Sequence, residues 1–562
     1  MRRLRLGGDL GYALLVGAVS LAGANVVLKL WRADLAVPFE YYGDVNLQHL
    51  LVRSVLDHGW YFENSTLGAP GSLELYDYPV LNGDTINVLV LSLLGLFGLG
   101  SAAAMNVLYL ASFPLVGIAG FLALRRLGAD PWPALVCAVL YALLPYHFLR
   151  GEGHLFLSTY YAVPAGAYLA AVVLSGERLR LAAVIGLAIL VGAASGSFYY
   201  AAFTVVLVVL AMLLRFLGTR DRGALLAGGL VVAAILGVAL VQLAPTLVYR
   251  AANGTNEEVA QRHTFESEVY SLKLTQLVLP LDAHRIDPVA RVKERYTKKF
   301  PPLDANAATL GIVGTVGLVW LFGVVLGALV GRRASPSHLT LATLALVSFL
   351  LATVGGAGTL VGVVFPQIRA WNRLSIFLAF FALAAVALGL TALGRRLTRP
   401  VAFGAVLAAV LAIGVFDQTS PAFVPLYEPV KAQWDVDAAF FSSLESQLPE
   451  GAKVAQFPYE AFPEPAAARQ AIYEPVKPYL HTDDLRWSYG AMRGRDDWAG
   501  ANLTRPTAEL VPIVRAAGFA AILVDRLGYG DDGAAVEAEL RQALGAEPER
   551  SPNNRYLVWK FS

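Results

Sequence analysis

Acidic and imidazole side chains stand beside long apolar segments at two places in the chain. Asp44 follows Phe39–Gly43 soon after the first apolar run, and Glu152 and His154 flank Gly153 after the third. A carboxylate at a membrane boundary can take a proton from an acceptor hydroxyl or bind a cation. An acid and an imidazole two residues apart can bind one metal. Alternatively, Asp44 is the N-cap of a helix, and Glu152 and His154 are ordinary polar residues at the membrane interface.

Two arginines, Arg369 and Arg373, flank Trp371 at the start of another apolar run. Four residues apart on a helix, they would share one face. Their guanidinium groups suit phosphate, because each can donate two parallel hydrogen bonds. Alternatively, they extend toward lipid headgroups from the end of a membrane span. The basic segment Arg285–Lys299 could hold an anionic headgroup or form a solvated loop face.

These residues belong to an unusually apolar chain of 562 residues. Hydrophobic residues make up 56% of it, charged residues 15%, and the mean hydropathy is +0.56. An ordinary soluble protein has about 25% charged residues, so the composition predicts a polytopic α-helical membrane protein. The net charge of +2 argues against nucleic acid as a partner. The single Cys137 excludes an intramolecular disulfide.

Eleven apolar runs are predicted to cross the membrane, at residues 11–30, 102–124, 132–148, 158–174, 181–194, 197–214, 224–247, 310–330, 339–354, 374–393 and 401–416. Fifteen basic residues fall in alternate connections between these runs. Because basic residues favour the cytoplasmic side, we expect the N-terminus inside and the C-terminal part outside the cytoplasmic membrane. The first run has no small-residue cleavage site, so it is expected to be a retained span rather than a signal peptide.

The chain divides into two expected domains, a transmembrane domain at 1–416 and an extracytoplasmic domain at 417–562. The second part holds 14 basic and 21 acidic residues among 146, which is a soluble-domain composition. The first outer loop, 31–101, should carry two membrane-surface helices, the amphipathic Val45–His58 and the short apolar Ile86–Leu99. No acid or base is predicted inside a span, which argues against an ion-coupled transporter.

Helix-like and strand-like segments alternate in 417–562, which predicts a small α/β domain. Expected strands are Lys453–Phe457, Ala520–Asp525 and Tyr556–Phe561, and expected helices are Val436–Leu448, Thr507–Ala517 and Ala534–Leu544. Between them, the segment 486–498 is rich in aromatic residues, arginine and glycine. Such a loop could stack on sugar rings and line an acceptor groove, or be an ordinary packed loop. Its candidate acceptor-binding residues are Trp487, Tyr489, Arg493 and Arg495.

This layout resembles the GT-C superfamily of integral-membrane glycosyltransferases. The shared features are a cytoplasmic N-terminus, a carboxylate after the first span, a long first outer loop, many spans and an outer C-terminal domain. The pair Glu152 and His154 resembles the second acidic motif of oligosaccharyltransferase catalytic subunits. The resemblance implies a divalent metal, Mg²⁺ or Mn²⁺, held by Asp44, Glu152 and His154.

Further short motifs look like those of YfhO-type bacterial membrane proteins of the same superfamily. They are Tyr41–Asp44, Leu67–Pro70 and the segment that holds Arg369 and Arg373. No WWDYG motif is present, and the segment Trp487–Gly490 is only partly similar to it. We therefore do not expect an enzyme that recognises glycosylation sequons in proteins.

The resemblance implies a glycosyltransferase that takes sugar from a polyprenyl-phosphate carrier at the outer face of the cytoplasmic membrane. The carrier phosphate would lie near Arg369 and Arg373, with its tail among the spans and membrane lipids. Asp44 would act as base on a glycan, lipid or protein acceptor. Such an enzyme would serve glycan biosynthesis in the cell envelope. The alternative is a non-enzymatic lipid or glycan transporter or an envelope assembly factor.

Overall fold

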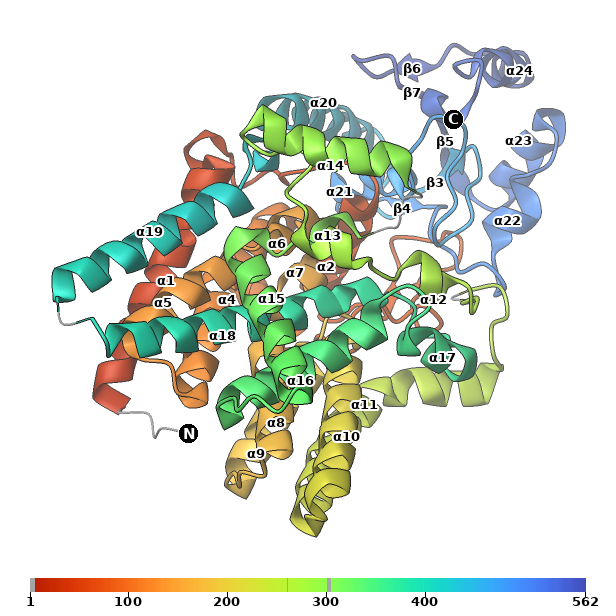
Figure 1. The fold of residues 1–562 in the computed structure, drawn as a ribbon. Coiled ribbons are helices and arrows are strands. Elements are labelled where there is room, and N and C mark those ends of the chain that lie inside the picture. Colours follow the sequence, from red (N-terminus) through yellow and green to blue (C-terminus); the bar gives the residue numbers. More distant parts are fainter. Residues whose placement is uncertain (1–5, 260, 301–304, 398, 562) are drawn as a thin grey trace.

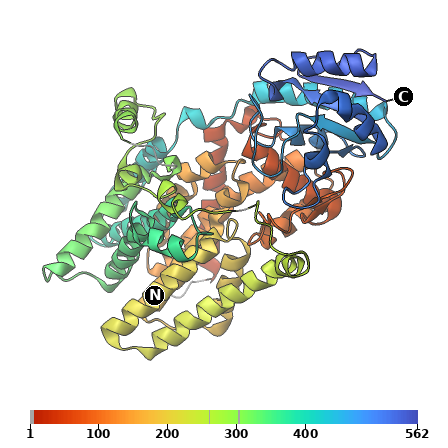
Figure 2. The ribbon, with the colours of Figure 1, turned by 90° about the vertical axis from the view of Figure 1, so that its right-hand side faces the viewer.

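The computed structural model describes residues 6–259, 261–300, 305–397 and 399–561. Helices dominate it, and a small sheet lies near the C-terminal end of the chain, in blue in Figure 1. The C-terminal elements form a lobe at one end of the molecule, as the turned view in Figure 2 also shows. The predicted combination of a helical membrane protein and a C-terminal sheet is therefore present.

Within the described ranges, nine helical segments are long and apolar enough to cross a membrane. They are Gly8–Leu28 in α1 (Leu6–Leu28), Ser101–Leu127 (α4), Pro131–Arg150 (α5 and α6), Leu155–Ser175 (α7 to α8), Tyr199–Thr219 (α10), Arg222–Asn253 (α11), Gly311–Leu329 (α15), Trp371–Gly394 (η4 and α18) and Pro400–Gln418 (α19). Two more predicted runs form shorter apolar helices, α9 (Leu181–Ala193) and α16 (Pro336–Ala352). All eleven runs are helical, while the number of spans and their orientation remain predictions.

Proline sets several helix boundaries. Pro336 and Pro400 occupy the first positions of α16 and α19, where a missing N–H group costs no hydrogen bond. Pro145 begins the short helix α6 (Pro145–Arg150) soon after α5 (Pro131–Ala142) ends. A proline within one continuous helix would remove a hydrogen bond and clash with the preceding turn. The interruption places the segment 151–154 directly after a short helix.

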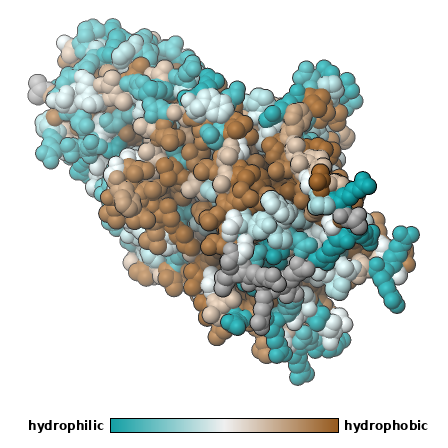
Figure 3. Space-filling view, turned by 90° about the vertical axis from the view of Figure 1, so that its left-hand side faces the viewer, coloured by the Kyte–Doolittle hydropathy of each residue, from teal (hydrophilic) through white to brown (hydrophobic). Residues whose placement is uncertain are grey.

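The membrane helices differ in what surrounds them. Helix α18 (Ser375–Gly394) packs against α5, α8 (Val163–Ser175), α15 and α16, and most of its side chains are buried. Helices α11 and α19 instead expose large apolar side chains such as Val241 and Val401. Figure 3 shows hydrophobic surface across the middle of one face and hydrophilic surface toward its ends. Such a band suits contact with lipid.

Both predicted loop helices are present, as α2 (Asp44–His58) and α3 (Thr85–Leu96). Helix α2 does not lie open on a membrane surface, because every residue from Val45 to Val55 is buried. It contacts α4 on one side and the C-terminal elements η6 (Glu474–Val476) and α21 (Lys477–Leu480) on the other. The amphipathic pattern thus predicted the helix correctly, but the polar face of the helix is covered by protein rather than by solvent.

The C-terminal lobe contains a five-stranded mixed sheet in the order β4-β3-β5-β7-β6. Its strands are β3 (Lys453–Phe457), β4 (Arg486–Trp487), β5 (Phe519–Asp525), β6 (Glu549–Arg550) and β7 (Tyr556–Lys560). Strand β3 pairs in parallel with β4 and β5, and β7 pairs antiparallel with β5 and β6. Three predicted helices appear as α20 (Tyr427–Ser446), α23 (Thr507–Ala516) and α24 (Ala534–Leu544). The three predicted strands are confirmed to within one residue.

The first outer loop is joined to this sheet by backbone hydrogen bonds. Trp487 N donates to Thr66 O over 2.8 Å, Ala69 N donates to Trp487 O over 2.9 Å, and Gly68 N donates to Tyr489 O over 2.8 Å. The loop segment therefore lies along β4, beside the small hairpin of β1 (Glu63–Asn64) and β2 (Leu73–Glu74). This pairing fixes the loop between the membrane helices and the C-terminal lobe.

Candidate active site

A cavity of about 620 Å³ brings together four of the residues predicted from sequence. Its lining includes Asp44, His154, Arg369 and Arg373, which come from three distant parts of the chain. The first outer loop supplies Asp44, the connection after α6 supplies His154, and the segment before α18 supplies both arginines. The fold thus collects a carboxylate, an imidazole and two guanidinium groups around one space.

Asp44 is the first residue of α2, and its side chain is half-exposed to the cavity. Gly43 before it has φ +59° and ψ −136°, a conformation that strains other residues. Among the described residues, no hydrogen bond from the Asp44 carboxylate to the backbone of α2 is found, so it is not a conventional N-cap. Burial and the nearby charge of Glu464 raise the pKa of Asp44, and Arg150 opposes them.

His154 lies beside this carboxylate. Its Nε2 is 3.9 Å from Asp44 Oδ2, which is longer than a hydrogen bond. Burial lowers the pKa of His154 to about 3, and the positive charges of Arg150 and Arg373 contribute. The imidazole is therefore neutral at physiological pH. It can accept or donate one hydrogen bond in the cavity without carrying a charge.

Glu152 has a different environment from its neighbour. It is buried, and its Oε2 accepts a hydrogen bond of 2.8 Å from Phe39 N. Burial raises the pKa of Glu152 to about 8. In the described ranges, no three His, Cys, Asp or Glu side chains are grouped closely enough to hold a metal ion. Asp44, Glu152 and His154 therefore do not form the predicted three-ligand metal site here, because Glu152 binds the backbone of the first loop instead.

The two predicted phosphate-binding arginines line the cavity, but not from one face of an α-helix. Arg369 lies in irregular chain before the 3₁₀ helix η4 (Trp371–Leu374), and Arg373 lies within it. Arg369 Nη1 is 2.6 Å from Glu266 Oε1. The Arg373 guanidinium lies 3.9 Å from the centroid of the Tyr199 ring, and none of the described carboxylates forms a salt bridge with it. Arg373 is thus the more available cation of the two.

Two further arginines, Arg150 and Arg262, line the same cavity and were not predicted as site residues. Arg150 directly precedes the Gly151–His154 segment, so its position next to a predicted site was a usable signal. Arg262 belongs to the long loop after α11, and its Nη1 is 3.9 Å from Glu464 Oε1. No local pattern in that loop distinguishes Arg262 from the other basic residues there. With Arg369 and Arg373, four guanidinium groups surround the cavity.

The predicted acceptor-binding residues of the 486–498 segment do not line this cavity. Trp487 is 0% exposed and donates from Nε1 to Thr482 Oγ1 over 2.9 Å, and Tyr489 is 4% exposed. The sugar-stacking prediction is therefore wrong for these two rings, because neither has a free face. They are buried where the first outer loop packs against β4.

The two arginines of that segment that were predicted to bind acceptor, Arg493 and Arg495, also contact neighbouring protein. Arg495 donates to both oxygens of Asp77, over 2.6 and 3.0 Å, and to the carbonyl of Asn253. The carbonyl of Arg493, a half-buried residue, accepts from Asn256 Nδ2 over 2.9 Å. Both residues thus join the C-terminal lobe to outer loops. In the described structure they line no acceptor groove beside Asp44.

A second cavity of about 620 Å³ borders the same loop. Three chain segments contribute successive residues to the two cavities. Residues 40–42 line the second cavity and Asp44 lines the first, and residues 148–149 are followed in the same way by Arg150. Residues 470–471 line the second cavity and residues 472–473 the first. These segments form a wall that the two cavities share.

Comparison with known proteins identifies the fold. No family model and no curated protein matches the chain. The solved structure of ArnT from Cupriavidus metallidurans in the apo state matches with a TM-score of 0.52 and 14% identity, over 98% of each chain. The same protein bound to undecaprenyl phosphate gives a TM-score of 0.51 and 14% identity, over 98% of this chain and 97% of that one.

The arabinofuranosyltransferase AftD from Mycobacteria matches with a TM-score of 0.50 and 16% identity. The alignment covers 92% of this chain and 35% of AftD, so this chain spans about a third of that protein's length. These structures are GT-C glycosyltransferases. The chain therefore has the GT-C membrane-glycosyltransferase fold, as its sequence layout predicted.

Proposed function

We propose that the protein is a glycosyltransferase that takes sugar from a polyprenyl-phosphate carrier at the outer face of the cytoplasmic membrane. The observation that carries this proposal is the first cavity. There, the Asp44 carboxylate and the neutral His154 line one cavity together with a set of arginines that includes Arg373. The likeness to a protein bound to undecaprenyl phosphate supports a lipid-linked donor.

The arginines would hold the phosphate of the carrier. Arg373 offers its donors without a competing carboxylate among the described residues, while the contact with Tyr199 orients its guanidinium plane. Arg369 is held by Glu266 and can direct its remaining N–H groups into the cavity. Hydrogen bonds from guanidinium to phosphate are both charge-assisted and directional. They would stabilise the negative charge that the phosphate gains when its bond to the sugar breaks.

Asp44 would take the proton of the acceptor hydroxyl as the new glycosidic bond forms. Its raised pKa makes the carboxylate a better proton acceptor than an exposed aspartate. Because His154 is neutral, it does not neutralise the carboxylate by forming an ion pair. The imidazole would instead orient Asp44 or the acceptor through a hydrogen bond.

The acceptor would approach through the second cavity. This cavity is separated from the first by the wall that carries Asp44. Its lining combines apolar side chains, including Phe423 and Leu426, with the charged Lys477 and Arg555. Such a lining can admit a molecule with both apolar and polar parts. The acceptor would thus meet the donor sugar beside Asp44 without sharing the donor cavity.

The test is donor turnover by the purified protein in lipid vesicles. Undecaprenyl-phosphate glucose, mannose and galactose serve as separate probes, with a bacterial envelope lipid and glycan extract as acceptor, and released undecaprenyl phosphate is measured. We expect the wild type to release it from at least one probe. Asp44→Asn should slow release by about 10²–10⁴-fold, the usual contribution of a general base, while undecaprenyl phosphate still binds.

Asp34→Asn is the matched control, because Asp34 lies in the same loop, is half-exposed and pairs with Lys431. It should leave turnover within about twofold, since exposed ion pairs contribute only about 0–1 kcal/mol. Equal turnover by the wild type and Asp44→Asn would exclude Asp44 as base. Movement of the intact donor across the vesicle without release of undecaprenyl phosphate would favour a transporter instead.

A further inference from the structure

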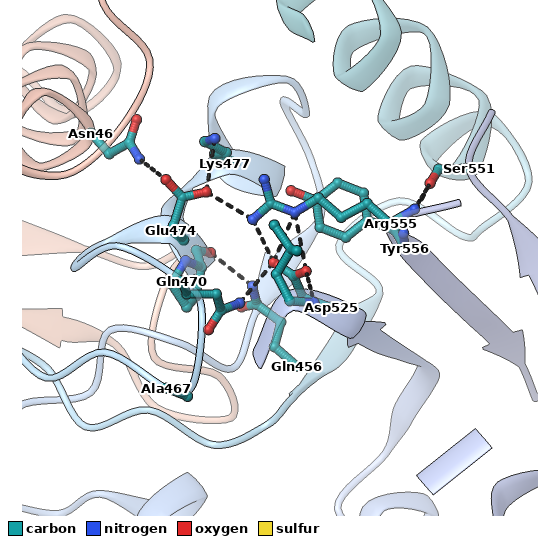
Figure 4. Close-up of polar contacts among 12 residues, drawn as sticks. Asn46, Gln456, Ala467, Gln470, Glu474, Lys477, Asp525, Ser551, Arg555 and Tyr556 are labelled. Atoms are coloured by element: carbon teal, nitrogen blue, oxygen red, sulfur yellow. Dashed lines mark hydrogen bonds and ion pairs between the residues drawn. The ribbon is translucent and has the colours of Figure 1, made fainter. Parts of the chain in front are cut away.

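The C-terminal lobe contacts the chain both before and after Asp44. Figure 4 shows the contact of Asn46 with Glu474 and the ion network around Glu474. Two residues after Asp44, Asn46 Nδ2 donates to Glu474 Oε1 over 3.4 Å. Three residues before it, the Tyr41 ring lies beneath Lys477, whose Nζ is 4.1 Å from the ring centroid. Glu474 and Lys477 are themselves joined, with Nζ 2.8 Å from Glu474 Oε2. One buried ion pair therefore contacts both flanks of Asp44.

This ion pair belongs to a larger buried network that reaches the central strands of the sheet. Arg555, directly before β7, places Nη2 2.7 Å from Glu474 Oε2 and 2.6 Å from Asp525 Oδ2. Asp525 ends β5 and also accepts from Gln470 Nε2 over 2.7 Å. Glu474, Lys477, Asp525 and Arg555 are each less than a tenth exposed. Because the loss of one member would leave a buried charge uncompensated, the network holds its members in place strongly.

Asp44 needs such external support. Gly43 before it has a backbone conformation open mainly to glycine, and the chain from 33 to 43 forms neither helix nor strand. The Asp44 carboxylate has no hydrogen-bond partner among the described residues. Its neighbour Asn46 is fully buried, so contacts at Asn46 and Tyr41 set the direction in which the first turn of α2 points. Misplacement of a reacting group by about 1 Å can cost about 10²-fold in rate.

We propose that Glu474 is a positioning residue that fixes the candidate base Asp44 through Asn46. The inference rests on the proposed function and deepens it. The C-terminal lobe then does more than cover the cavity, since its buried ion network sets the geometry at which the acceptor proton is removed. Lys477 and Arg555 hold Glu474 in the orientation that Asn46 requires.

The test compares two buried asparagines that both join the first outer loop to the C-terminal lobe. Asn46→Ala removes the contact with Glu474 and leaves the ion network intact. Asn64→Ala is the matched control, because Asn64 Nδ2 donates to Tyr479 OH over 3.0 Å, away from Asp44. For both variants, kcat, the KM for the active donor probe, undecaprenyl phosphate binding and deuterium exchange of residues 39–47 are measured.

We expect Asn46→Ala to lower kcat about 10- to 100-fold with unchanged KM, because the phosphate-binding arginines come from other elements. Exchange in 39–47 should rise. Asn64→Ala should lower thermal stability but keep kcat within about twofold. Glu474→Ala, which removes the acceptor of Asn46 Nδ2, should lower kcat as Asn46→Ala does, whereas Glu537→Ala, which removes another ion pair of the lobe, should resemble Asn64→Ala.

Equal kcat losses in the two asparagine variants would show that activity depends only on the general packing of the first loop against the C-terminal lobe. That result would overturn the positioning role of Glu474. A rise in exchange without a kcat loss in Asn46→Ala would also overturn it. If the wild type turned over no donor probe, the proposed glycosyltransferase function would fail on its own test. In that case, unchanged deuterium exchange in Asn46→Ala would also overturn the proposal that Glu474 restrains the Asp44 segment through Asn46. A rise in exchange confined to residues 39–47 would support that restraint.

Discussion

The imidazole Nε2 of His154 lies 3.9 Å from the carboxylate of Asp44, although the two residues belong to connections that are far apart in the chain. Their meeting depends on contacts on either side. Glu152 accepts from the backbone of Phe39 and so ties the connection after α6 to the first loop. The C-terminal lobe holds the same loop through Asn46. The pair is therefore a product of three separate parts of the chain.

Replacement of His154 should slow transfer less than replacement of Asp44. Its pKa of about 3 means that the imidazole carries no charge at neutral pH, so its loss would remove the proposed hydrogen bond during transfer rather than an ion pair. A neutral hydrogen bond contributes about 0.5–1.5 kcal/mol, so His154→Ala should lower kcat by up to about tenfold. The measurement is kcat between pH 6 and 8. A loss as large as that of Asp44→Asn would make His154 the base instead.

Removal of Arg373 should weaken undecaprenyl phosphate binding more than removal of Arg369. A hydrogen bond to a charged group contributes about 1.5–3 kcal/mol, so Arg373→Ala should raise Kd about tenfold to hundredfold. Arg369→Ala should have a smaller effect, because Glu266 already engages that guanidinium. Native mass spectrometry or a lipid-binding titration measures both variants.

Arg373→Lys should restore only part of the affinity, because an ammonium lacks the two parallel donors of a guanidinium. Arg291→Ala, on the exposed face of α14 (Asp287–Lys299), is the matched control and should leave Kd unchanged. If both cavity variants bind the carrier phosphate normally, the two arginines contact only lipid headgroups or protein.

Glu152→Gln separates a structural role of this carboxyl from a metal-binding one. The glutamine amide oxygen can still accept from Phe39 N, so we expect activity within about threefold of wild type. Glu152→Ala leaves that buried N–H group unpaired, which typically costs about 1–3 kcal/mol in stability. Thermal unfolding and turnover are measured for both variants. If Glu152→Gln loses turnover and a chelator causes the same loss in the wild type, the result would support the hypothesis of a shared Mg²⁺ or Mn²⁺ site.

The sequence was informative wherever local periodicity sets structure. Strand β3 has the predicted bounds, Lys453–Phe457, and so does α24 at Ala534–Leu544, because both patterns are complete within a few residues. All eleven apolar runs are helices for the same reason. Arg369 and Arg373 both line the first cavity, but they do not share one face of an α-helix as predicted, since Arg369 lies in irregular chain and Arg373 in a 3₁₀ helix.

Contacts between distant segments were not visible in the sequence. The 486–498 segment has the composition of a sugar-binding loop, but composition does not say which face solvent reaches. Trp487 is buried because residues 66–69 pair with it, and that pairing joins segments far apart in the chain. The sequence around Asn46 gave no signal of its contact with Glu474, because that residue lies 428 positions away in the chain. The packing of distant segments determines these sites, and a local sequence pattern does not predict such packing.

The contribution of Glu460 to the stability of the folded protein should fall as pH rises from about 5 to 8. Burial raises the pKa of the Glu460 side chain, which lies in the C-terminal lobe, from 4.5 to about 8. Between those values the folded state binds a proton that the unfolded state has released, so rising pH favours unfolding. Glu460→Gln mimics the protonated form and should flatten the dependence of Tm on pH over this range.

Glu509→Gln is the control, because Glu509 is an exposed carboxyl of the same lobe. It should leave the pH profile of Tm unchanged. Thermal unfolding between pH 5 and 9 in one detergent measures all three proteins. A wild-type Tm that rises steadily over this range, with no difference in Glu460→Gln, would contradict the assignment.

Orientation in the membrane is the last prediction, and every site above depends on it. A reporter that is active only outside the cytoplasm should be active when fused at the C-terminus. The same reporter inserted at Gly128, between α4 and α5, should be inactive, because Arg125 and Arg126 precede it and basic connections stay inside. A cytoplasmic fluorescent reporter at the two positions should give the opposite pattern. An inside signal at the C-terminus would move Asp44, His154 and Arg373 to the cytoplasmic face, since the C-terminal lobe packs directly against the loop that carries Asp44. The donor would then have to be presented at the cytoplasmic face instead.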